Sequence, residues 1–253
     1  MAQNVPEEPS HSTGHNKQRG FGGWLREVAT IIVIALLLSF LIKTFLFRAF
    51  YIPSGSMEET LEINDRIFVN LLVPEPFDLN RGDVVVFKDT KGWLPELAPA
   101  TDGPGTWIRD ALIFVGLAPD TSEQHLVKRV IGMEGDHVVC CDADGRITVN
   151  GEPLNEPYIY PGATPSDVPF DVVVPEGKVW VMGDHRNASA DSREHLQGEG
   201  GGFVDVADIE GKAAVTAWPL NRAGFVGSYP DVFENVPEPS ASDPSTSEPA
   251  GSK

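Results

Sequence analysis

The sequence predicts a mostly β protein in which an antiparallel β body follows one N-terminal transmembrane helix. Two observations predict this. The first is an apolar run of 20 residues, Val28–Phe47, and at about 1.5 Å per residue such a run spans the roughly 30 Å hydrocarbon core of a bilayer. The second is a series of short β-branched runs, separated by turn residues, over the rest of the 253-residue chain.

The apolar run is expected to be an anchor that is not cleaved. Cleavable signal peptides have an apolar core of about 7–15 residues that ends in small residues, whereas this run is longer and ends in Thr-Phe-Leu-Phe. We therefore predict a disordered cytoplasmic segment over residues 1–20 and a transmembrane anchor over residues 21–47. Because basic residues precede the run, we expect a single-pass protein of the plasma (cytoplasmic) membrane with its body outside, although Lys43 and Arg48 weaken this asymmetry.

The body is expected over residues 48–229 and contains eight apolar, β-branched runs between turn residues. The runs expected to form strands are 66–72, 83–88, 126–132, 137–141, 146–151, 170–175, 178–184 and 211–220. The segment Asp142-Ala143-Asp144-Gly145 predicts a hairpin turn between two of them. Residues 92–124, rich in Pro and Gly, predict an insertion that either packs on the body or dips into the membrane interface. Residues 230–253 have the acidic, Pro- and Ser-rich composition of a disordered tail.

Charge and cysteine content exclude several classes of function. The net charge is −18, and all of it lies after the anchor, so we expect no nucleic-acid partner, because nucleic-acid binding depends on Lys and Arg. Cys140 and Cys141 are adjacent on an expected strand. Successive strand residues face opposite sides, and we therefore expect two small buried side chains in preference to a disulfide. No C-x-x-C motif or histidine cluster is present, and we expect no metal and no other cofactor.

Two serines flank a glycine in the segment RAFYIPSGSMEETL, which follows the apolar run directly. Pro53 fixes φ and Gly55 permits a tight turn, so Ser56 can be presented on a rigid edge, which a flexible linker would not require. A serine hydroxyl is a weak nucleophile and needs a neighbouring base. Histidine is the usual base, but none of the histidines lies in a known motif such as G-x-S-x-G with its downstream partners.

A neutral lysine is the alternative base. Holding a lysine of ordinary pKa neutral at pH 7 costs about 4.6 kcal/mol, and burial in an apolar site can lower a lysine pKa by about 3–5 units. Lys128 meets this requirement on a predicted strand between Val127 and Arg129, as do Lys88 and Lys178 on other strands. Strand alternation places Lys128 and Arg129 on opposite faces. It does not say which of the two is buried, but arginine stays protonated and cannot act as a base.

Four segments in chain order resemble the conserved boxes of bacterial signal peptidase I: YIPSGSMEETL, RGDVVVFK, HLVKRVIGMEGD and VMGDHRNASADSR, followed by GFVDVADIEGKA. Members of this family are membrane-anchored Ser/Lys endopeptidases that remove signal peptides from exported preproteins. The resemblance covers the anchor and most of residues 48–219, and it implies a signal-peptidase-like antiparallel β catalytic body. It also implies cleavage after A-x-A-like sites. The implied partners are preprotein signal peptides and the lipid bilayer, with the secretion translocon as a further candidate.

The resemblance assigns a role to each matching polar residue at the centre of the site. Ser56 matches the nucleophile and Lys128 matches the general base. Ser54 matches a serine that helps to bind the oxyanion together with the backbone N–H of Ser56. Ser189 matches a serine that hydrogen-bonds to the lysine and orients it.

The resemblance also assigns supporting residues and an apolar cleft. Asp191 and Arg193 match residues that support the site, which we expect to form an ion pair. The apolar residues that match positions near the substrate cleft are Phe50, Ile52, Met57 and Val127.

Two places depart from the family pattern. Glu58-Glu59 stand where Met-Pro often follows the nucleophile box, and these carboxylates either tune the charge preference for substrates or face solvent. His185, Asn187 and Ala188 replace a commoner Asn-x-Asp-Asn. A second hypothesis is therefore another membrane-anchored serine protease that uses His185 as its base. A third is a non-catalytic anchored β domain that binds exported partners.

Overall fold

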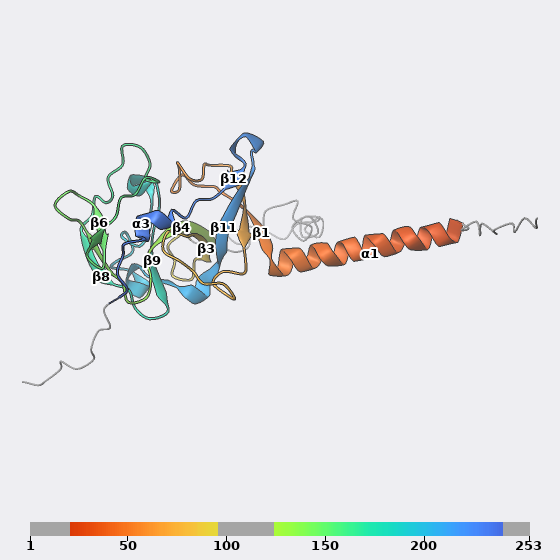
Figure 1. Ribbon diagram of the computed structural model, residues 1–253, viewed down its shortest axis with the longest axis horizontal. Coiled ribbons are helices and arrows are strands. Elements are labelled where there is room, and N and C mark those ends of the chain that lie inside the picture. Colours follow the sequence, from red (N-terminus) through yellow and green to blue (C-terminus); the bar gives the residue numbers. More distant parts are fainter. Residues whose placement is uncertain (1–20, 96–123, 240–253) are drawn as a thin grey trace, which may run out of the picture. The chain divides into compact units, whose positions relative to one another are not determined.

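The computed structural model describes residues 21–95 and 124–239 (Figure 1). Predictions for residues 1–20, for most of the insertion and for the end of the tail lie outside these ranges. The chain divides into two units, Met1–Ile42 and Lys43–Lys253. The first contains most of helix α1 (Phe21–Phe45). Within α1, the stretch Gly23–Ile42 has a mean hydropathy of 2.3 and is long and apolar enough to cross a membrane.

Within the described ranges, the strands of the second unit form two antiparallel sheets. The larger has the order β1-β2-β11-β3-β4-β9-β10, with β12 paired to β11. Its strands are β1 (Phe47–Tyr51), β2 (Arg66–Asn70), β3 (Val84–Lys88), β4 (His125–Gly132), β9 (Lys178–Met182), β10 (Val204–Asp205), β11 (Ile209–Trp218) and β12 (Gly224–Phe225). The predicted fold class, a mostly antiparallel β body with one N-terminal apolar helix, is confirmed.

The smaller sheet has the order β7-β6-β5-β8. Its strands are β5 (His137–Cys140), β6 (Ile147–Val149), β7 (Glu152–Pro153) and β8 (Phe170–Val173). Within the body, β6 and β8 lie at one end, and β1 and β12 of the larger sheet lie at the other (Figure 1). Short helices complete the described structure: η1 (Arg186–Ala188), η2 (Glu199–Gly202), η3 (Val206–Asp208), η4 (Leu220–Arg222) and α3 (Pro230–Phe233).

Each of the eight predicted runs contains a strand, because β-branched residues on a half-buried pleated surface give a strong local signal. The predicted hairpin is present: Cys140 pairs with Ile147, and the Asp142 N–H donates to the Arg146 carbonyl at 2.9 Å. The strands that were not predicted are β1, β7, β10 and β12. Three of these have two residues each, too few to show alternation, and β1 continues directly from the apolar run.

Strand β4 is covered on both faces. Leu126 and Val130 belong to one buried cluster, and Ile131 belongs to another that lies under the smaller sheet. A third buried cluster holds the segment that carries the predicted nucleophile; its members are Ile52, Met57, Leu61, Ile67, Val69, Val84, Val86 and Ala213. Polar residues in the middle of β4 are therefore placed in the interior of the body.

The expected start of the tail is wrong for residues 230–239. Helix α3 lies in this segment, and Phe233 and Val236 are 7% and 8% exposed in the cluster under the smaller sheet. The Asn150 side chain also donates to the Pro237 carbonyl at 2.7 Å. Apolar side chains three residues apart supply enough buried surface to fix this segment, despite the surrounding Pro and Glu residues.

The expectation for the two cysteines is also wrong. Cys140 and Cys141 are joined by a disulfide, and neither is buried, since Cys140 is half-buried and Cys141 is exposed. The expectation assumed that both residues lie on a regular strand, where neighbours point apart. Strand β5 ends at Cys140, so Cys141 begins the turn and the alternation no longer applies.

Candidate active site

Ser56 and Lys128, which are 72 positions apart in sequence, meet in the structure. Ser56 lies in the turn between β1 and β2, and Lys128 lies in the middle of β4. The Lys128 Nζ is 2.6 Å from the Ser56 Oγ. Lys128 is 3% exposed and Ser56 is 8% exposed, so the predicted nucleophile and the predicted base are in hydrogen-bond contact and shielded from water.

The turn that carries Ser56 is fixed by backbone hydrogen bonds. The Ile52 N–H donates to the Asp65 carbonyl at 2.9 Å, and the Asn64 N–H donates to the Ile52 carbonyl at 2.9 Å. The Leu61 N–H donates to the Met57 carbonyl at 2.7 Å, which makes a helical turn directly after the nucleophile. These bonds hold Ser56 within a closed loop above the buried side chains of Ile52, Met57 and Leu61.

The surroundings of Lys128 favour its neutral form. Burial lowers the pKa of Lys128 from 10.5 to about 8, although the nearby charges of Asp191 and Asp184 raise it. Arg193 adds a smaller lowering effect. Among the described residues, Lys128 forms no ion pair, so no carboxylate holds its proton in place.

The competing lysines are placed differently. Lys88 is 41% exposed and forms an ion pair with Glu210 at 3.2 Å. Lys178 forms an ion pair with Asp205. An ion pair with a carboxylate favours the protonated form of lysine, so neither residue has the environment that a lysine base requires.

Arg129, next to Lys128 on β4, is fully buried and fully paired. Its Nε and Nη2 donate to Asp184 at 2.9 and 2.7 Å. Its Nη1 donates to the carbonyls of Gly82 and Gly227 at 2.6 and 2.8 Å, and its guanidinium lies 4.1 Å from the ring centre of Tyr158. Burial acts to lower the pKa of Arg129, but Asp184 outweighs burial and the pKa is raised.

Comparison with known proteins identifies the family of the chain. Residues 25–218 match a family model described as signal peptidase, peptidase S26. The chain belongs to this family. The resemblance predicted from the four segments is thereby confirmed, and so is the prediction that the chain is an enzyme of the signal peptidase I kind.

Several relatives have similar sequences over most of the chain. Signal peptidase I of Mycobacterium tuberculosis H37Rv is 40% identical over 225 residues, which cover 81% of this chain and 76% of that protein. The probable signal peptidase I-2 of a Synechocystis strain is 35% identical over 226 residues, covering 89% and 86%. A crystal structure of a signal peptidase I from Enterococcus faecalis V583 aligns with a TM-score of 0.34 and 24% identity, covering 54% of this chain and 97% of that one. The family assignment depends on the sequences alone.

The residues that match supporting positions of the family lie beside the dyad. Arg193 donates to Asp191 through Nε at 2.9 Å and through Nη2 at 2.8 Å, which makes a buried two-bond ion pair. The Gly183 N–H also donates to Asp191 at 3.0 Å. Burial acts to raise the pKa of Asp191, but the hydrogen bonds and charge of Arg193 outweigh it and the pKa is lowered.

Ser189 is placed near the nucleophile without a hydrogen bond to Lys128. A Cβ atom added to Gly183 would lie 2.3 Å from the Ser189 Oγ and 2.4 Å from the Ser56 carbonyl oxygen. This close approach requires glycine at 183 and brings Ser189 against the nucleophile turn. The Ser189 Oγ is buried and has no hydrogen-bond partner among the described residues. Its role in orienting the lysine remains a prediction.

The residues expected to face the substrate differ in exposure. Ser54 is exposed, two positions before the nucleophile. Phe50, Ile52, Met57 and Val127 all belong to one apolar cluster. Ile52 and Met57 are 2% and 1% exposed, whereas Phe50 and Val127 are half-buried. In this structure, Phe50 and Val127 offer surface to a ligand, and Ile52 and Met57 do not.

Sequence reasoning did not single out Asp184, Thr60 and Tyr160. Thr60 donates to Asp184 at 2.5 Å, which links the nucleophile segment to the Arg129 pair. The Tyr160 ring stacks on His185 with 3.9 Å between ring centres. Asp184 and Thr60 lie within the segments that carry the family resemblance, so the signal was present, but Tyr160 lies outside them.

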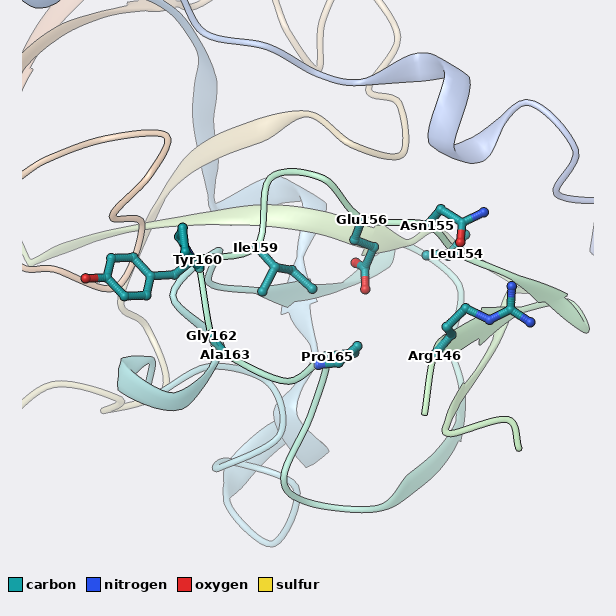
Figure 2. A pocket seen from close by; sticks show the side chains of 10 residues that line it. Arg146, Leu154, Asn155, Glu156, Ile159, Tyr160, Gly162, Ala163 and Pro165 are labelled. Atoms are coloured by element: carbon teal, nitrogen blue, oxygen red, sulfur yellow. The ribbon is translucent and has the colours of Figure 1, made fainter. Parts of the chain in front are cut away.

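Tyr160 also lines a pocket of about 330 Å³. Figure 2 shows Tyr160 at one end of this pocket, Arg146 at the other, and Glu156 between them. The Glu156 carboxylate is held by Arg186, whose Nη1 donates to it at 3.0 Å. Among the described residues, no group of three or more His, Cys, Asp or Glu side chains could hold a metal ion.

Proposed function

We propose that the chain is a membrane-anchored serine endopeptidase that cleaves N-terminal signal peptides from exported preproteins, with Ser56 as nucleophile and Lys128 as general base. The observation that carries this proposal is the 2.6 Å contact between the Lys128 Nζ and the Ser56 Oγ in a chain of the signal peptidase family. The low pKa of Lys128 supports it, since a base must be neutral to accept a proton.

In the proposed mechanism, neutral Lys128 takes the Ser56 proton while the Oγ attacks the scissile carbonyl carbon. The carbonyl π electrons move to oxygen, and the resulting oxyanion accepts hydrogen bonds from the Ser56 N–H and the Ser54 hydroxyl. Protonated Lys128 then gives its proton to the leaving amine. Lys128 next activates a water molecule, which hydrolyses the acyl-enzyme and releases Ser56. Asp191, Arg193 and Ser189 support the lysine in this scheme.

The proposed substrates have small side chains at the cleavage site. Phe50 and Val127 present apolar surface beside the dyad, and the buried Ile52 and Met57 leave little depth behind them. We expect this apolar surface to accept alanine-sized side chains in preference to larger ones, in line with the A-x-A pattern that precedes signal-peptide cleavage sites.

We also propose that helix α1 anchors the chain, with its N-terminus in the cytoplasm and the body outside and resting on the lipid bilayer. The strand register supports contact with lipid, because Phe68 of β2 and Phe225 of β12 both pair with Val215 of β11 and lie in one row. Phe68 is 45% exposed, Phe225 is 92% exposed and Trp218, further along β11, is 53% exposed. A row of exposed aromatic side chains is typical of a surface that enters the membrane interface.

The test is cleavage of a preprotein with an A-x-A site by the full chain in detergent. We expect Ser56→Ala and Lys128→Ala each to lower kcat by about 10³-fold or more while remaining folded. Lys88→Ala, which removes an exposed lysine from the neighbouring strand, is the matched control and should cleave normally. Activity in Lys128→Ala together with loss in His185→Ala would support the histidine-dependent protease instead. If the wild type cut no preprotein, a non-catalytic binding domain would be the better description.

A further inference from the structure

Glu58 and His185, which both depart from the family pattern, contact each other behind the nucleophile. The His185 Nδ1 lies 2.8 Å from the Glu58 Oε2 and 3.2 Å from the carbonyl oxygen of Gly55. A carbonyl oxygen can only accept a hydrogen bond. The Glu58 carboxylate is likewise an acceptor, so the hydrogen of the ring is assigned to Nδ1, where it is shared between Glu58, the nearer acceptor, and the Gly55 carbonyl.

His185 also holds the next carbonyl of the chain. Its backbone N–H donates to the Ser56 carbonyl oxygen at 3.1 Å. Its ring stacks on Tyr160, with 3.9 Å between ring centres and 18° between the planes, and its side chain is only 16% exposed. The Glu58 carboxylate packs so close to the turn that a Cβ atom at Gly55 would lie 2.8 Å from the Glu58 Oε1. The imidazole is thus fixed on several sides. Its ring contacts the Gly55 carbonyl, and the backbone N–H of the same residue holds the Ser56 carbonyl.

The Gly55 carbonyl belongs to the same peptide group as the Ser56 N–H. This peptide bond is not among the cis bonds of the chain. In a planar trans peptide, the C=O and the N–H point in opposite directions. A hydrogen bond that fixes the Gly55 oxygen therefore also fixes the direction of the Ser56 N–H. Among the described residues, this N–H has no hydrogen-bond acceptor, so it is available to a ligand.

We propose that His185 and Glu58 are positioning residues that hold the Gly55–Ser56 peptide plane and so aim the Ser56 N–H at the oxyanion of the acyl-transfer transition state. This inference rests on the proposed function. The physical reason is that an oxyanion donor is effective when its direction is set before the charge develops. Glu58 acts through His185, and His185 acts through the backbone, so neither touches the substrate.

Two substitutions at 185 separate the hydrogen-bond donor from the ring. His185→Asn places an amide N–H near the position of Nδ1 and removes the ring, whereas His185→Phe keeps a ring to stack on Tyr160 and removes the donor. We expect His185→Asn to keep kcat within about threefold of the wild type. His185→Phe should lower kcat by about 10- to 100-fold with little change in KM, since removal of an oxyanion donor costs about 10²–10³ in kcat and misalignment costs part of that.

Substitutions at the neighbouring residues Glu58 and Glu59 test the role of the Glu58 carboxylate. Glu58→Ala should lower kcat by about threefold to tenfold, because the ring loses its nearer acceptor and can turn away from Gly55. Glu59→Ala removes the same charge from an exposed position one residue further on and should leave kcat unchanged. The double variant of His185→Phe and Glu58→Ala should be no slower than His185→Phe alone, because the two residues act as one unit.

Affinity for a substrate-based peptide aldehyde distinguishes a positioning role of His185 from a merely structural one. The aldehyde forms a tetrahedral adduct with Ser56 and needs the oxyanion donor, whereas the uncleaved peptide does not. His185→Phe should weaken binding of the aldehyde by the same factor by which it lowers kcat. Binding of the uncleaved peptide is measured in the inactive variant Ser56→Ala. Adding His185→Phe to that variant should leave its affinity for the uncleaved peptide unchanged.

Two results would overturn the inference: wild-type kcat in His185→Phe, or an equal loss in His185→Asn and His185→Phe, which would make the ring rather than the donor the important feature. The inference can fail while the proposed function stands, since wild-type cleavage that is lost in Ser56→Ala does not depend on the variants at 185. If Ser56→Ala kept full activity, the proposed function would be wrong and this inference would fall with it.

Discussion

Lys128 and Arg129 are neighbours on β4, and the structure buries both but surrounds them differently. Arg129 has a carboxylate, two backbone carbonyls and an aromatic ring as partners. Lys128 has the Ser56 hydroxyl and no ion pair among the described residues. The pKa of Arg129 is raised, and the pKa of Lys128 is lowered to about 8.

The difference shows that burial alone does not decide the chemistry of a cation. A buried cation with a counterion keeps its proton and ties segments of the chain together, whereas a buried cation without one tends to lose its proton and becomes a base. Arg129 joins β4 to Asp184, Gly82 and Gly227, which are far apart in sequence. Three substitutions test whether the two roles are separate.

The largest effect is expected from Arg129→Met. It leaves the carboxylate of Asp184, which is 0% exposed, without its counterion, and we expect the free energy of unfolding to fall by about 3–5 kcal/mol. Chemical unfolding of the full chain in detergent, followed by tryptophan fluorescence, measures this change. Arg48→Met removes an exposed member of the pair with Glu210 and should cost about 1 kcal/mol or less. Equal losses in the two variants would refute a structural role for the buried pair.

Lys128→Met should have the opposite effect on stability. Below about pH 8, folded and unfolded chains both hold the Lys128 proton. Between about pH 8 and 10.5 the folded chain has released it and the unfolded chain has not, so wild-type stability rises with pH through this window. Methionine carries no charge to bury, and the variant should be inactive but up to about 3 kcal/mol more stable at pH 7.

Unfolding curves at pH 7 and pH 10 measure this effect, and the advantage of Lys128→Met should shrink at the higher pH. Lys88→Met, at a lysine that is 41% exposed, should show no such pH dependence. A stability gain that did not change with pH would point to better packing of the methionine rather than to the cost of a buried charge.

The smallest effect is expected from Asp191→Asn. Because Lys128 must be neutral to act, kcat/KM of the wild type should rise with pH through about 8. Asp191 is the strongest nearby charge that raises the pKa of Lys128. Its removal should lower that pKa and move the acidic limb of the profile to lower pH by up to about one unit. Asp171→Asn, at a side chain that is 73% exposed, should leave the profile in place, and a shift to higher pH in Asp191→Asn would contradict the assignment of the base.

The sequence predicted that Lys128 and Arg129 lie on opposite faces of one strand, but it did not predict which of them has a counterion. Alternation along residues 126–132 placed the two cations on opposite faces, but the carboxylate that distinguishes them lies 55 positions away from Arg129. Local pattern cannot show which cation a distant aspartate will reach. The same limit applies to Glu58 and His185, whose contact depends on two segments that meet only in the folded chain.

The wrong expectations have local causes. Residues 230–253 are rich in Pro, Ser and Glu on average, and this average composition hides Phe233 and Val236, which pack into the core. The β-branched run predicts that Cys140 and Cys141 share one strand, but the strand ends between them. Composition and alternation predict the structure of long segments well, and they fail where one or two side chains determine whether a short segment packs or where a strand ends.

The order of the strands bears on when Ser56 and Lys128 can meet as the chain is synthesised. Ser56 follows β1 and Lys128 lies on β4, but β2 and β3 do not pair with each other, since β11 lies between them (Figure 1). β11 ends at Trp218, 90 positions after Lys128. A growing chain therefore possesses both reactive residues long before it possesses the strand that joins their sheet regions. We therefore expect Ser56 and Lys128 to come into stable contact only after β11 has been synthesised and has paired with β2 and β3.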